Sequence, residues 1–271
     1  MEDSKLQYKM VAVDLDGTLL DETHDITDEV RQVAEEVQGA GLVFTIATGR
    51  MFQSAVQIAG KLELDVPLVT YNGAYIKCSR SGRVYDHVTI GQDVAQEVLQ
   101  WMEPFPVEPY AYVNDELYVE RITERTRHYC HVTKVRVHEV GKMGPFLKEN
   151  PTMLLFMGDE VLMDQLKPKL ALDFMQRLSV TKSFPTFLEM MVGGANKATG
   201  LAKLAAHYGI KREEIIAVGD NHNDIEMLRY AGVGAAVANA HQDVKQAAYY
   251  VAGKGYTQGV LEVVRRFVSG Q

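Results

Sequence analysis

Short apolar runs alternate with stretches of helical periodicity along the first part of the chain. Met10–Val13 and Leu42–Ala47 are apolar runs that each stop at polar residues, which is typical of buried strands. Between them, apolar residues recur at helical spacing from Val30 to Val37, and Thr27 stands where a helix N-cap is expected. The repeated order of strand and helix predicts an α/β fold, in which helices cover a parallel sheet.

The pattern changes in the middle of the chain and then returns. Two turn signals, Ser79–Gly82 and Asn114-Asp115, each lie between apolar segments and predict β-hairpins. We therefore expect residues 84–186 to form a separate, inserted α+β unit with antiparallel strands. After this insert the strand and helix patterns alternate again, so residues 1–83 and 187–271 are expected to form one α/β core.

The composition narrows the class of partner. Hydrophobic residues make up 46% of the chain and charged residues 24%, as in ordinary globular proteins. A net charge of -8 argues against nucleic acid or an anionic membrane as the natural partner. Cys78 and Cys130 are too few for a disulfide framework, and the sequence has neither a signal-peptide core nor a bilayer-spanning apolar run. We expect a cytoplasmic protein, a monomer or a weak homo-oligomer, that acts on a small molecule.

Polar clusters follow three of the predicted strands. These clusters are Asp14-Leu15-Asp16-Gly17-Thr18, Thr48-Gly49-Arg50 and Gly219-Asp220-Asn221-His222-Asn223-Asp224. In an open α/β sheet the ligand crevice lies beyond the carboxyl ends of the strands, so we expect the clusters to meet there. Four carboxylates in one crevice repel one another unless a cation lies among them, and oxygen ligands favour Mg²⁺.

Asp14 and Asp16 stand two residues apart and are followed at once by Gly17. On a strand their side chains would share one face, but the glycine lets the chain turn and separates them. One carboxylate then suits a nucleophile, and the other suits a general acid that later acts as a base. The same short motif also occurs in calcium loops and in turns, so alone it leaves catalysis open.

Lys197 follows Gly193-Gly194-Ala195-Asn196 and opens a predicted helix. A glycine-loosened backbone, a helix N-terminus and an ammonium group together can bind phosphate. The alternative is a solvated lysine in the first turn of the helix, where the helix dipole mildly disfavours it.

The order of these motifs resembles the haloacid dehalogenase superfamily. Thr70-Tyr71-Asn72-Gly73-Ala74 and Leu188-Glu189-Met190 are similar to segments of its Cof-type sugar-phosphatase branch. The resemblance covers residues 8–83 and 187–271, whereas the insert matches in position and size only. It implies a Rossmann-like core with an inserted α+β cap that governs substrate specificity.

The resemblance also implies a function and a set of site residues. The implied enzyme is a Mg²⁺-dependent phosphatase that hydrolyses small phosphate monoesters, such as sugar phosphates, through a phospho-aspartate on Asp14, with Asp16 as general acid/base. The implied phosphate-binding residues are Leu15, Thr48, Gly49, Lys197 and Asn223. The implied metal ligands are Asp14, Asp16 through its backbone carbonyl, Asp220 and Asp224. Arg50, Asn72 and Glu189 are further candidates for binding the substrate.

Two positions depart from the usual pattern of this branch, and two rival functions stay open. His222 stands where an acidic residue is frequent, and Ala198 follows the lysine where glycine is common, but neither removes a catalytic group. A sugar phosphomutase would use the same nucleophile but would need a bisphosphate primer. A non-enzymatic sensor is disfavoured because the implied catalytic residues are all present. The substrate and the role of His222 stay open.

One further segment, Gly232–Val237, approximates a dinucleotide-binding fingerprint. Val237 takes the place of the third glycine, and the segment follows a helix rather than a strand. We therefore expect a tight turn there.

Overall fold

The computed structural model describes residues 8–23 and 26–269. At its centre lies a parallel sheet, as the alternation of strand and helix predicts. In spatial order its strands are β14 (Tyr250–Val251), β13 (Val233–Ala236), β12 (Ile215–Gly219), β1 (Met10–Val13) and β2 (Val43–Ile46). The central strands are almost entirely apolar because helices cover both faces of the sheet.

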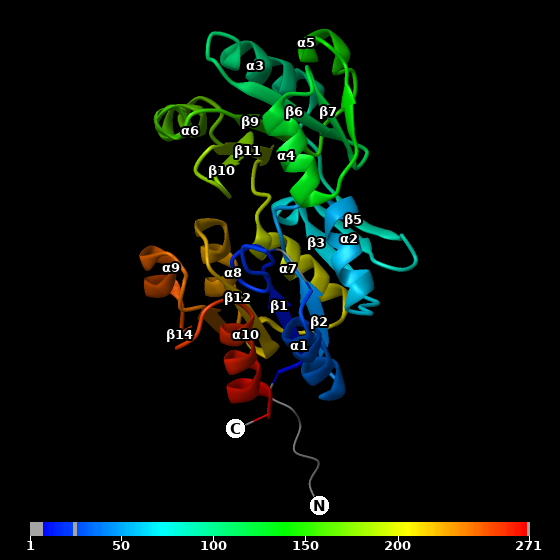
Figure 1. Ribbon diagram of the computed structural model, residues 1–271, viewed down its shortest axis with the longest axis vertical. Coiled ribbons are helices and arrows are strands. Elements are labelled where there is room, and N and C mark those ends of the chain that lie inside the picture. The colour runs from blue at the N-terminus through cyan, green and yellow to red at the C-terminus, as the bar shows by residue number, and fades with distance from the viewer. Residues whose placement is uncertain (1–7, 24–25, 270–271) are drawn as a thin grey trace, which may run out of the picture.

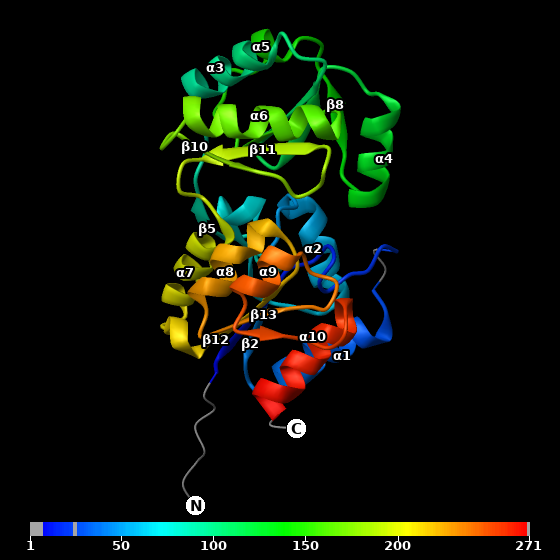
Figure 2. The same ribbon diagram turned by 90° about the vertical axis from the view of Figure 1, so that its left-hand side faces the viewer.

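Helices cover both faces of this sheet. They are α1 (Asp28–Gly39), α2 (Phe52–Lys61), α7 (Lys197–His207), α8 (Ile225–Tyr230), α9 (Gln242–Ala247) and α10 (Tyr256–Val264). From β1 the chain moves to β2, and from β12 it moves the other way to β13, so right-handed crossovers place α1 and α8 on opposite faces. Helix α10 packs beside α1, and α7 packs beside α8 (Figure 2). Thr27 is the N-cap of α1, as predicted, and accepts a hydrogen bond from the Val30 amide at 3.4 Å.

A small antiparallel sheet extends this core beyond β2. It consists of β3 (Pro67–Thr70), β4 (Tyr75–Cys78) and β5 (Val84–His87). A parallel bridge between Ala47 and Val69 joins β3 to the end of β2. The hairpin predicted at Ser79–Gly82 connects β4 to β5.

The second lobe is built on an antiparallel sheet with one parallel edge pair, and it sits above the core lobe in Figure 1. In spatial order its strands are β10 (Leu178–Thr181), β11 (Phe187–Val192), β9 (Met153–Met157), β6 (Glu108–Val113), β7 (Glu116–Val119) and β8 (Val137–Glu139). Its helices are α3 (Gln92–Met102), α4 (Glu124–Thr133), α5 (Met143–Phe146) and α6 (Glu160–Asp173). Helices α3, α5 and α6 lie over the outer side of the sheet, while α4 extends along its side toward the core lobe (Figures 1 and 2). The predicted hairpin at Asn114-Asp115 joins β6 to β7.

Strand pairing shows which sheet the strands near residues 84 and 186 belong to. Strand β5 (Val84–His87) pairs with β4 in the core lobe, whereas β11 (Phe187–Val192) pairs with β9 and β10 in the second lobe. By strand pairing, the chain passes from the core lobe to the second lobe after β5, within residues 88–91, and returns to the core lobe after Val192, the last residue of β11. The division into a core and a cap at 84 and 186 stays a prediction, and the pairing favours these later edges.

The expected tight turn at Gly232–Val237 is wrong, because Val233–Ala236 forms β13 between β12 and β14. A Cβ atom on Gly234 would lie 2.1 Å from the carbonyl oxygen of Leu228. The glycine is there because the end of α8 packs directly against this strand.

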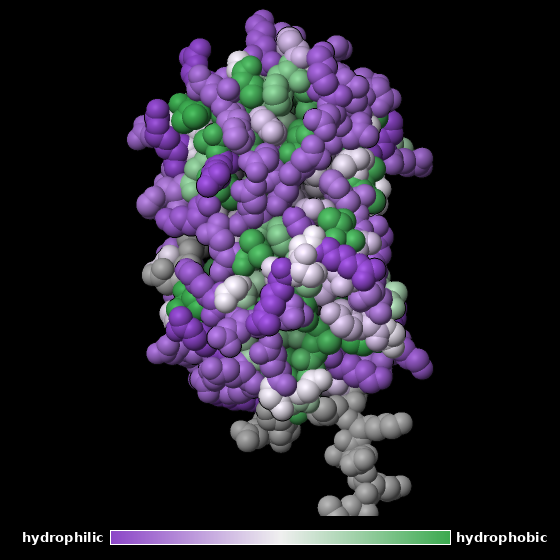
Figure 3. Space-filling view, turned by 90° about the vertical axis from the view of Figure 1, so that its right-hand side faces the viewer, coloured by the Kyte–Doolittle hydropathy of each residue, from purple (hydrophilic) through white to green (hydrophobic). Residues whose placement is uncertain are grey.

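No helix within the described ranges is long and apolar enough to cross a bilayer. On the face shown in Figure 3, hydrophobic side chains form small patches among hydrophilic ones.

Candidate active site

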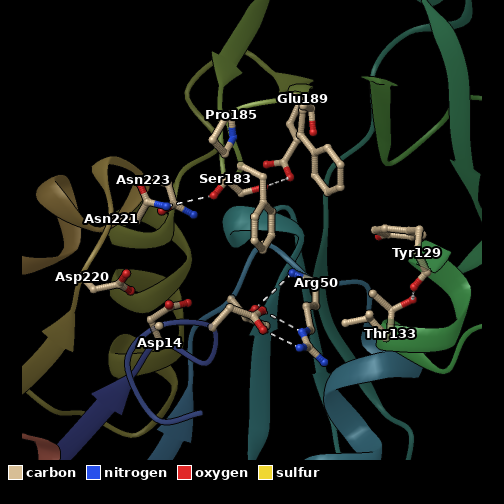
Figure 4. A pocket seen from close by; sticks show the side chains of 18 of the residues that line it. Asp14, Arg50, Tyr129, Thr133, Ser183, Pro185, Glu189, Asp220, Asn221 and Asn223 are labelled. Atoms are coloured by element: carbon tan, nitrogen blue, oxygen red, sulfur yellow. Dashed lines mark hydrogen bonds and ion pairs between the residues drawn. The ribbon is translucent and has the colours of Figure 1, made fainter. Parts of the chain in front are cut away.

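The site begins where the strand order of the core sheet reverses. Strands β1 and β12 are neighbours, and the chain leaves them in opposite directions, which makes their carboxyl ends a topological switch point. Asp14 directly follows β1, and its amide donates to the carbonyl oxygen of Val218 in β12 at 3.0 Å. Asp220 directly follows β12. Asp14 and Asp220 therefore lie close together at the floor of a cavity between the lobes (Figure 4).

Lys197 is fully buried beside these carboxylates. Its Nζ atom donates to Oδ1 of Asp14 and to Oδ1 of Asp224, at 2.6 Å in each case. The residue is the first of α7, and Asn196 caps that helix through the amide of Thr199. Burial lowers the pKa of Lys197, but Asp14 and Asp224 outweigh burial and raise it above its usual value. The alternative of a solvated lysine is therefore wrong.

Asp14, Asp220 and Asp224 can hold a metal ion, because each offers an oxygen and these oxygens lie within 4.8 Å of one another. Burial raises the pKa of Asp14 well above its usual value, against the opposing effect of Lys197. Burial and the neighbouring Asp224 raise the pKa of Asp220 to about 6. A bound cation would reduce the electrostatic repulsion between these carboxylates.

The charge balance and the donor atoms fit a hard divalent cation. With Asp16 included, four carboxylates meet two cationic side chains, Lys197 and Arg50, so two negative charges remain when all the groups are ionised. Carboxylate oxygens are the donors that Mg²⁺ takes in proteins.

The close approach of Asp220 to the loop after β1 explains why a glycine follows Asp16. Gly17 has φ 84°, and a Cβ atom there would lie 2.4 Å from Oδ2 of Asp220. The next residue, Thr18, donates its hydroxyl to Oδ1 of Asp220 at 2.7 Å. Any side chain at position 17 would therefore collide with the carboxylate of Asp220 unless one of the two moved.

Asp16 and Arg50 form a bidentate pair in the cavity. Arg50 donates from Nε to Oδ2 of Asp16 at 2.7 Å and from Nη2 to Oδ1 (Figure 4). Two parallel hydrogen bonds fix the plane of the carboxylate as well as its position. The side chain of Asp16 is thus turned toward Arg50, outside the group of three carboxylates that could hold a metal.

The loop after β2 brings the predicted Thr48 and Gly49 to the same cavity. Thr48 is buried, its amide donates to the Val69 carbonyl at 2.9 Å, and its Oγ1 accepts from the Arg50 amide at 3.1 Å. Leu15 is different, because its side chain lies fully within the apolar core. Any contribution from Leu15 to phosphate binding must therefore come from its backbone.

Asn223, Asn72 and Glu189 form a chain of hydrogen bonds that crosses between the lobes. Asn223 Nδ2 donates to Asn72 Oδ1 at 2.9 Å, and Asn72 Nδ2 donates to Glu189 Oε2 at 2.9 Å. Ser183 completes the chain by donating to Glu189 Oε1. Burial raises the pKa of Glu189. Asn223 and Glu189 line the cavity, whereas the buried Asn72 stands behind them and holds both.

The cavity has a volume of about 690 Å³ and is lined by both lobes. Its lining from the second lobe, which no sequence motif identified, includes Tyr129, Ser183, Phe184 and Phe187. His222 is exposed and lies beside Asp243, with 3.5 Å between Nε2 and Oδ2. It does not line the cavity itself, but its ring lies 4.9 Å from that of His241, which does.

Comparisons with known proteins agree with this geometry. The family model for haloacid dehalogenase-like hydrolases matches residues 11–264. The chain is 30% identical over 279 residues to 5-amino-6-(5-phospho-D-ribitylamino)uracil phosphatase YcsE of Bacillus subtilis (strain 168), with 97% of each chain covered. The crystal structure of TM0651 from Thermotoga maritima matches with a TM-score of 0.81 and 31% identity, covering 96% of this chain and 97% of that one.

The sugar phosphatase BT4131, of haloacid dehalogenase subclass IIB, matches with a TM-score of 0.82 and 25% identity, over 96% of this chain and 98% of that one. The α/β fold expected from the sequence is confirmed by these structures. The chain therefore belongs to the haloacid dehalogenase-like hydrolases and is an enzyme of the phosphatase type.

Proposed function

We propose that the protein is a Mg²⁺-dependent phosphatase that hydrolyses phosphate monoesters of small metabolites, sugar phosphates among them, through a phospho-aspartate on Asp14. One observation carries the proposal. The buried carboxylate of Asp14 lies at the floor of the cavity, with the ammonium of Lys197 on Oδ1 and two further carboxylates beside it. Phosphoryl transfer needs this combination of a fixed nucleophile and concentrated charge.

In the first half of the proposed reaction, a carboxylate oxygen of Asp14 attacks phosphorus and the ester oxygen leaves with a proton from Asp16. In the second half, Asp16 takes a proton from a water molecule that attacks the phospho-aspartate, and inorganic phosphate leaves. Because both oxygens of Asp16 accept from Arg50 in the structure, at least one of these hydrogen bonds must open before Asp16 can carry the proton that it gives to the leaving group.

The remaining site residues take supporting roles in this proposal. Asp14, the backbone carbonyl of Asp16, and Asp220 would hold Mg²⁺, with Asp224 in support, and the bound ion would supply charge neutralisation. The residues proposed to bind the oxygens of the phosphoryl group are Leu15 through its backbone, Thr48, Gly49, Lys197 and Asn223.

The second lobe is proposed to act as the specificity cap. It supplies part of the cavity wall, Tyr129 and Phe187 among it, and so can exclude water and contact the leaving group. Among the relatives, BT4131 is named a sugar phosphatase, and YcsE is named for a phospho-ribitylamino compound. Both names support a small phosphorylated metabolite as the substrate. We further propose a cytoplasmic location, which the two free thiols of Cys78 and Cys130 support.

Release of inorganic phosphate from a panel of sugar and other small phosphates, without a bisphosphate primer, tests the proposal against the phosphomutase alternative. Asp14→Asn keeps the shape of the side chain but removes the attacking charge, so kcat should fall by several orders of magnitude. EDTA should abolish turnover, and Mg²⁺ should restore it.

The matched control is Asp243→Asn, which removes an exposed carboxylate outside the cavity and should leave kcat unchanged. Full activity in EDTA, or a tenth of the wild-type kcat in Asp14→Asn, would overturn the assignment.

A further inference from the structure

A carboxylate of the second lobe is buried against the core beside the cavity. Glu189, on β11, is 4% exposed, and both of its oxygens accept hydrogen bonds, Oε1 from the hydroxyl of Ser183 and Oε2 from Nδ2 of Asn72. Asn221 of the core donates from Nδ2 to the carbonyl oxygen of Ser183 at 2.9 Å. Glu189 therefore joins the two lobes at a point where both of its oxygens are already engaged.

The backbone around Asn72 holds its side chain in one place. Asn72 has φ 50°, and asparagine is one of the few residues that adopt this left-handed conformation readily. Its amide donates to the carbonyl oxygen of Thr48, and the amide of Tyr71 donates to that of Arg50, at 3.0 Å in each case. The side chain of Asn72 is 2% exposed and does not line the cavity. Asn72 is thus fixed to the loop after β2, where it can hold a neighbouring side chain but not a substrate.

The carboxylate sets the direction of the hydrogen bonds in this chain. A carboxylate only accepts, so Asn72 must turn its NH₂ group toward Glu189 and its carbonyl oxygen toward Asn223. Asn223 must then donate one N–H to Asn72, with 2.9 Å between Nδ2 and Oδ1. The Oδ1 atom of Asn223 is buried and has no hydrogen-bond partner among the described residues. The orientation of Asn223 is therefore imposed by Asn72 and Glu189, because its own carbonyl group gains nothing from it.

This orientation leaves a second N–H on Asn223. A side-chain amide nitrogen carries two hydrogens, and within the described ranges Nδ2 of Asn223 donates only to Asn72. Asn223 lines the cavity, and Figure 4 shows it on the same side as Asp220, above Asp14. If the amide were reversed, a carbonyl oxygen would take the place of Nδ2 and would repel the oxygens of a phosphate. An N–H there would instead donate a charge-assisted hydrogen bond.

We propose that Glu189 and Asn72 are positioning residues for phosphate binding: the carboxylate of Glu189 orients the amide of Asn72, which in turn orients an N–H of Asn223 toward the phosphoryl group. This inference rests on the proposed phosphatase function, in which Asn223 binds the phosphoryl oxygens. Glu189 and Asn72 act through Asn223 and do not contact the substrate. Because Glu189 belongs to the second lobe, the phosphate site of the core is complete only while that lobe is docked.

Equilibrium binding of inorganic phosphate to the full chain in saturating Mg²⁺, measured by calorimetry, tests this role without turnover. Glu189→Ala should weaken binding by at least about tenfold, as the loss of one hydrogen bond to a charged group allows. Glu189→Gln should weaken binding less, because the glutamine oxygen can still accept from Asn72 while its NH₂ group faces the hydroxyl of Ser183. Failure of the wild type to bind phosphate, or equal affinity in the wild type and Glu189→Ala, would overturn the inference.

Glu97 offers a control in the same lobe. Its Oε2 atom lies 2.8 Å from Nη1 of Arg177, and neither residue lines the cavity. Glu97→Ala therefore removes a paired carboxylate of the second lobe and should leave phosphate binding unchanged. A loss as large as that in Glu189→Ala would show that phosphate binding responds to any charge change in this lobe, which would contradict the proposed role.

A double-mutant cycle shows whether Glu189 acts through Asn223. Asn223→Ala should weaken phosphate binding at least as much as Glu189→Ala, and adding Glu189→Ala to it should change the affinity by less than about twofold. Asn72→Gly, which permits the left-handed backbone and removes the linking amide, should behave as Glu189→Ala does. A structural role of Glu189 would lower the affinity in both backgrounds, so effects that multiply would overturn the inference. If Glu189→Ala does not fold, the cycle with Glu189→Gln, which keeps the side-chain volume, decides the question in the same way.

Hydrolysis of phosphate esters, measured separately, distinguishes this inference from the phosphatase assignment. If no ester is hydrolysed while phosphate binding depends on Glu189 through Asn223, the proposed function falls and the positioning role stands. If esters are hydrolysed and Glu189→Ala leaves phosphate binding unchanged, the positioning role falls and the phosphatase stands.

Discussion

At the scale of single residues, the site is a balance of buried charges around Lys197. Its side chain is completely buried, and both of its acidic partners, Asp14 and Asp224, are buried as well. Removing one member of such a group leaves uncompensated charge in a medium of low dielectric constant. Lys197 should therefore contribute to folding as well as to the proposed phosphate binding.

Lys197→Met, which keeps much of the side-chain volume and removes the charge, should lower the free energy of unfolding by about 3–5 kcal/mol in EDTA. Saturating Mg²⁺ should reduce this loss, since a bound divalent cation compensates the same carboxylates. Urea unfolding in EDTA and in Mg²⁺ measures both values.

Lys203 offers a matched control on the same helix, α7. Its Nζ atom lies 2.6 Å from Oδ2 of Asp86, but its side chain is 46% exposed. Lys203→Met should therefore lower the free energy of unfolding by less than about 1 kcal/mol. Equal losses in the two variants would show that the burial of Lys197 has no energetic consequence.

At the scale of elements, a hairpin of the second lobe caps a helix of the core. The N-cap residue of α2, Met51, makes no side-chain hydrogen bond of its own. Instead, Oδ1 of Asp115, in the turn between β6 and β7, accepts from the amides of Phe52 at 3.1 Å and Gln53 at 3.4 Å. It also accepts from the hydroxyl of Tyr71 at 2.9 Å. The hairpin thus supplies acceptors that the start of α2 lacks.

Asp115→Ala should lower the free energy of unfolding by about 2 kcal/mol, because it removes an N-cap and leaves the buried Tyr71 hydroxyl without an acceptor. Asp159→Ala is the comparison, since Asp159 caps α6 at the surface through the amides of Val161 and Leu162. Loss of that exposed cap should lower the free energy of unfolding by about 1 kcal/mol. Urea unfolding tests the order, and a loss at Asp115 no greater than at Asp159 would contradict it.

The carboxylate of Asp115 also predicts how the stability of the protein changes with pH. Burial raises the pKa of Asp115, and this effect exceeds the opposing hydrogen bonds from Tyr71 and Gln53. The native state then binds the proton more tightly than the unfolded chain, so this group's contribution to stability is complete at low pH. It is lost as pH rises from the usual aspartate pKa through the raised native pKa. Asp115→Asn does not titrate, so the stability of wild type minus that of Asp115→Asn should fall between pH 3 and pH 7. A constant or rising difference in urea unfolding would contradict the direction.

The elements show why part of the site was predictable from sequence. Asp14 and Asp220 follow apolar strands, and the rule for open parallel sheets brings such positions together without further information. The sequence predicts a turn at Gly234 where the structure has a strand, because a glycine is typical both of turns and of strands that another element approaches closely. Only the contact of Gly234 with Leu228 shows that the second explanation holds. The rings of Tyr129 and Phe187 meet because α4 lies beside β11, and no local motif marks such a long-range contact.

At the scale of the whole molecule, one apolar cluster joins the two lobes. The ring of Tyr71 in the core meets that of Tyr112 in β6 edge-to-face, with 5.7 Å between centroids. Met153 and Met157 on β9 belong to the same cluster as the core sheet. A second cluster, which includes Leu154 and Phe156, lies between the outer side of the cap sheet and its helices. A lobe with its own core but an apolar contact to its neighbour should fold together with that neighbour.

Cooperative unfolding of the two lobes is therefore the last prediction. Trp101 is the only tryptophan in the sequence and lies on α3, so its fluorescence reports the second lobe, whereas far-UV circular dichroism reports both lobes. The two signals should give coincident urea transitions. Tyr71→Ala removes both the ring contact with Tyr112 and the hydroxyl bound to Asp115, and it should separate the transitions. Separate transitions in the wild type would mean that the lobes fold independently and that the shared cluster does not couple them.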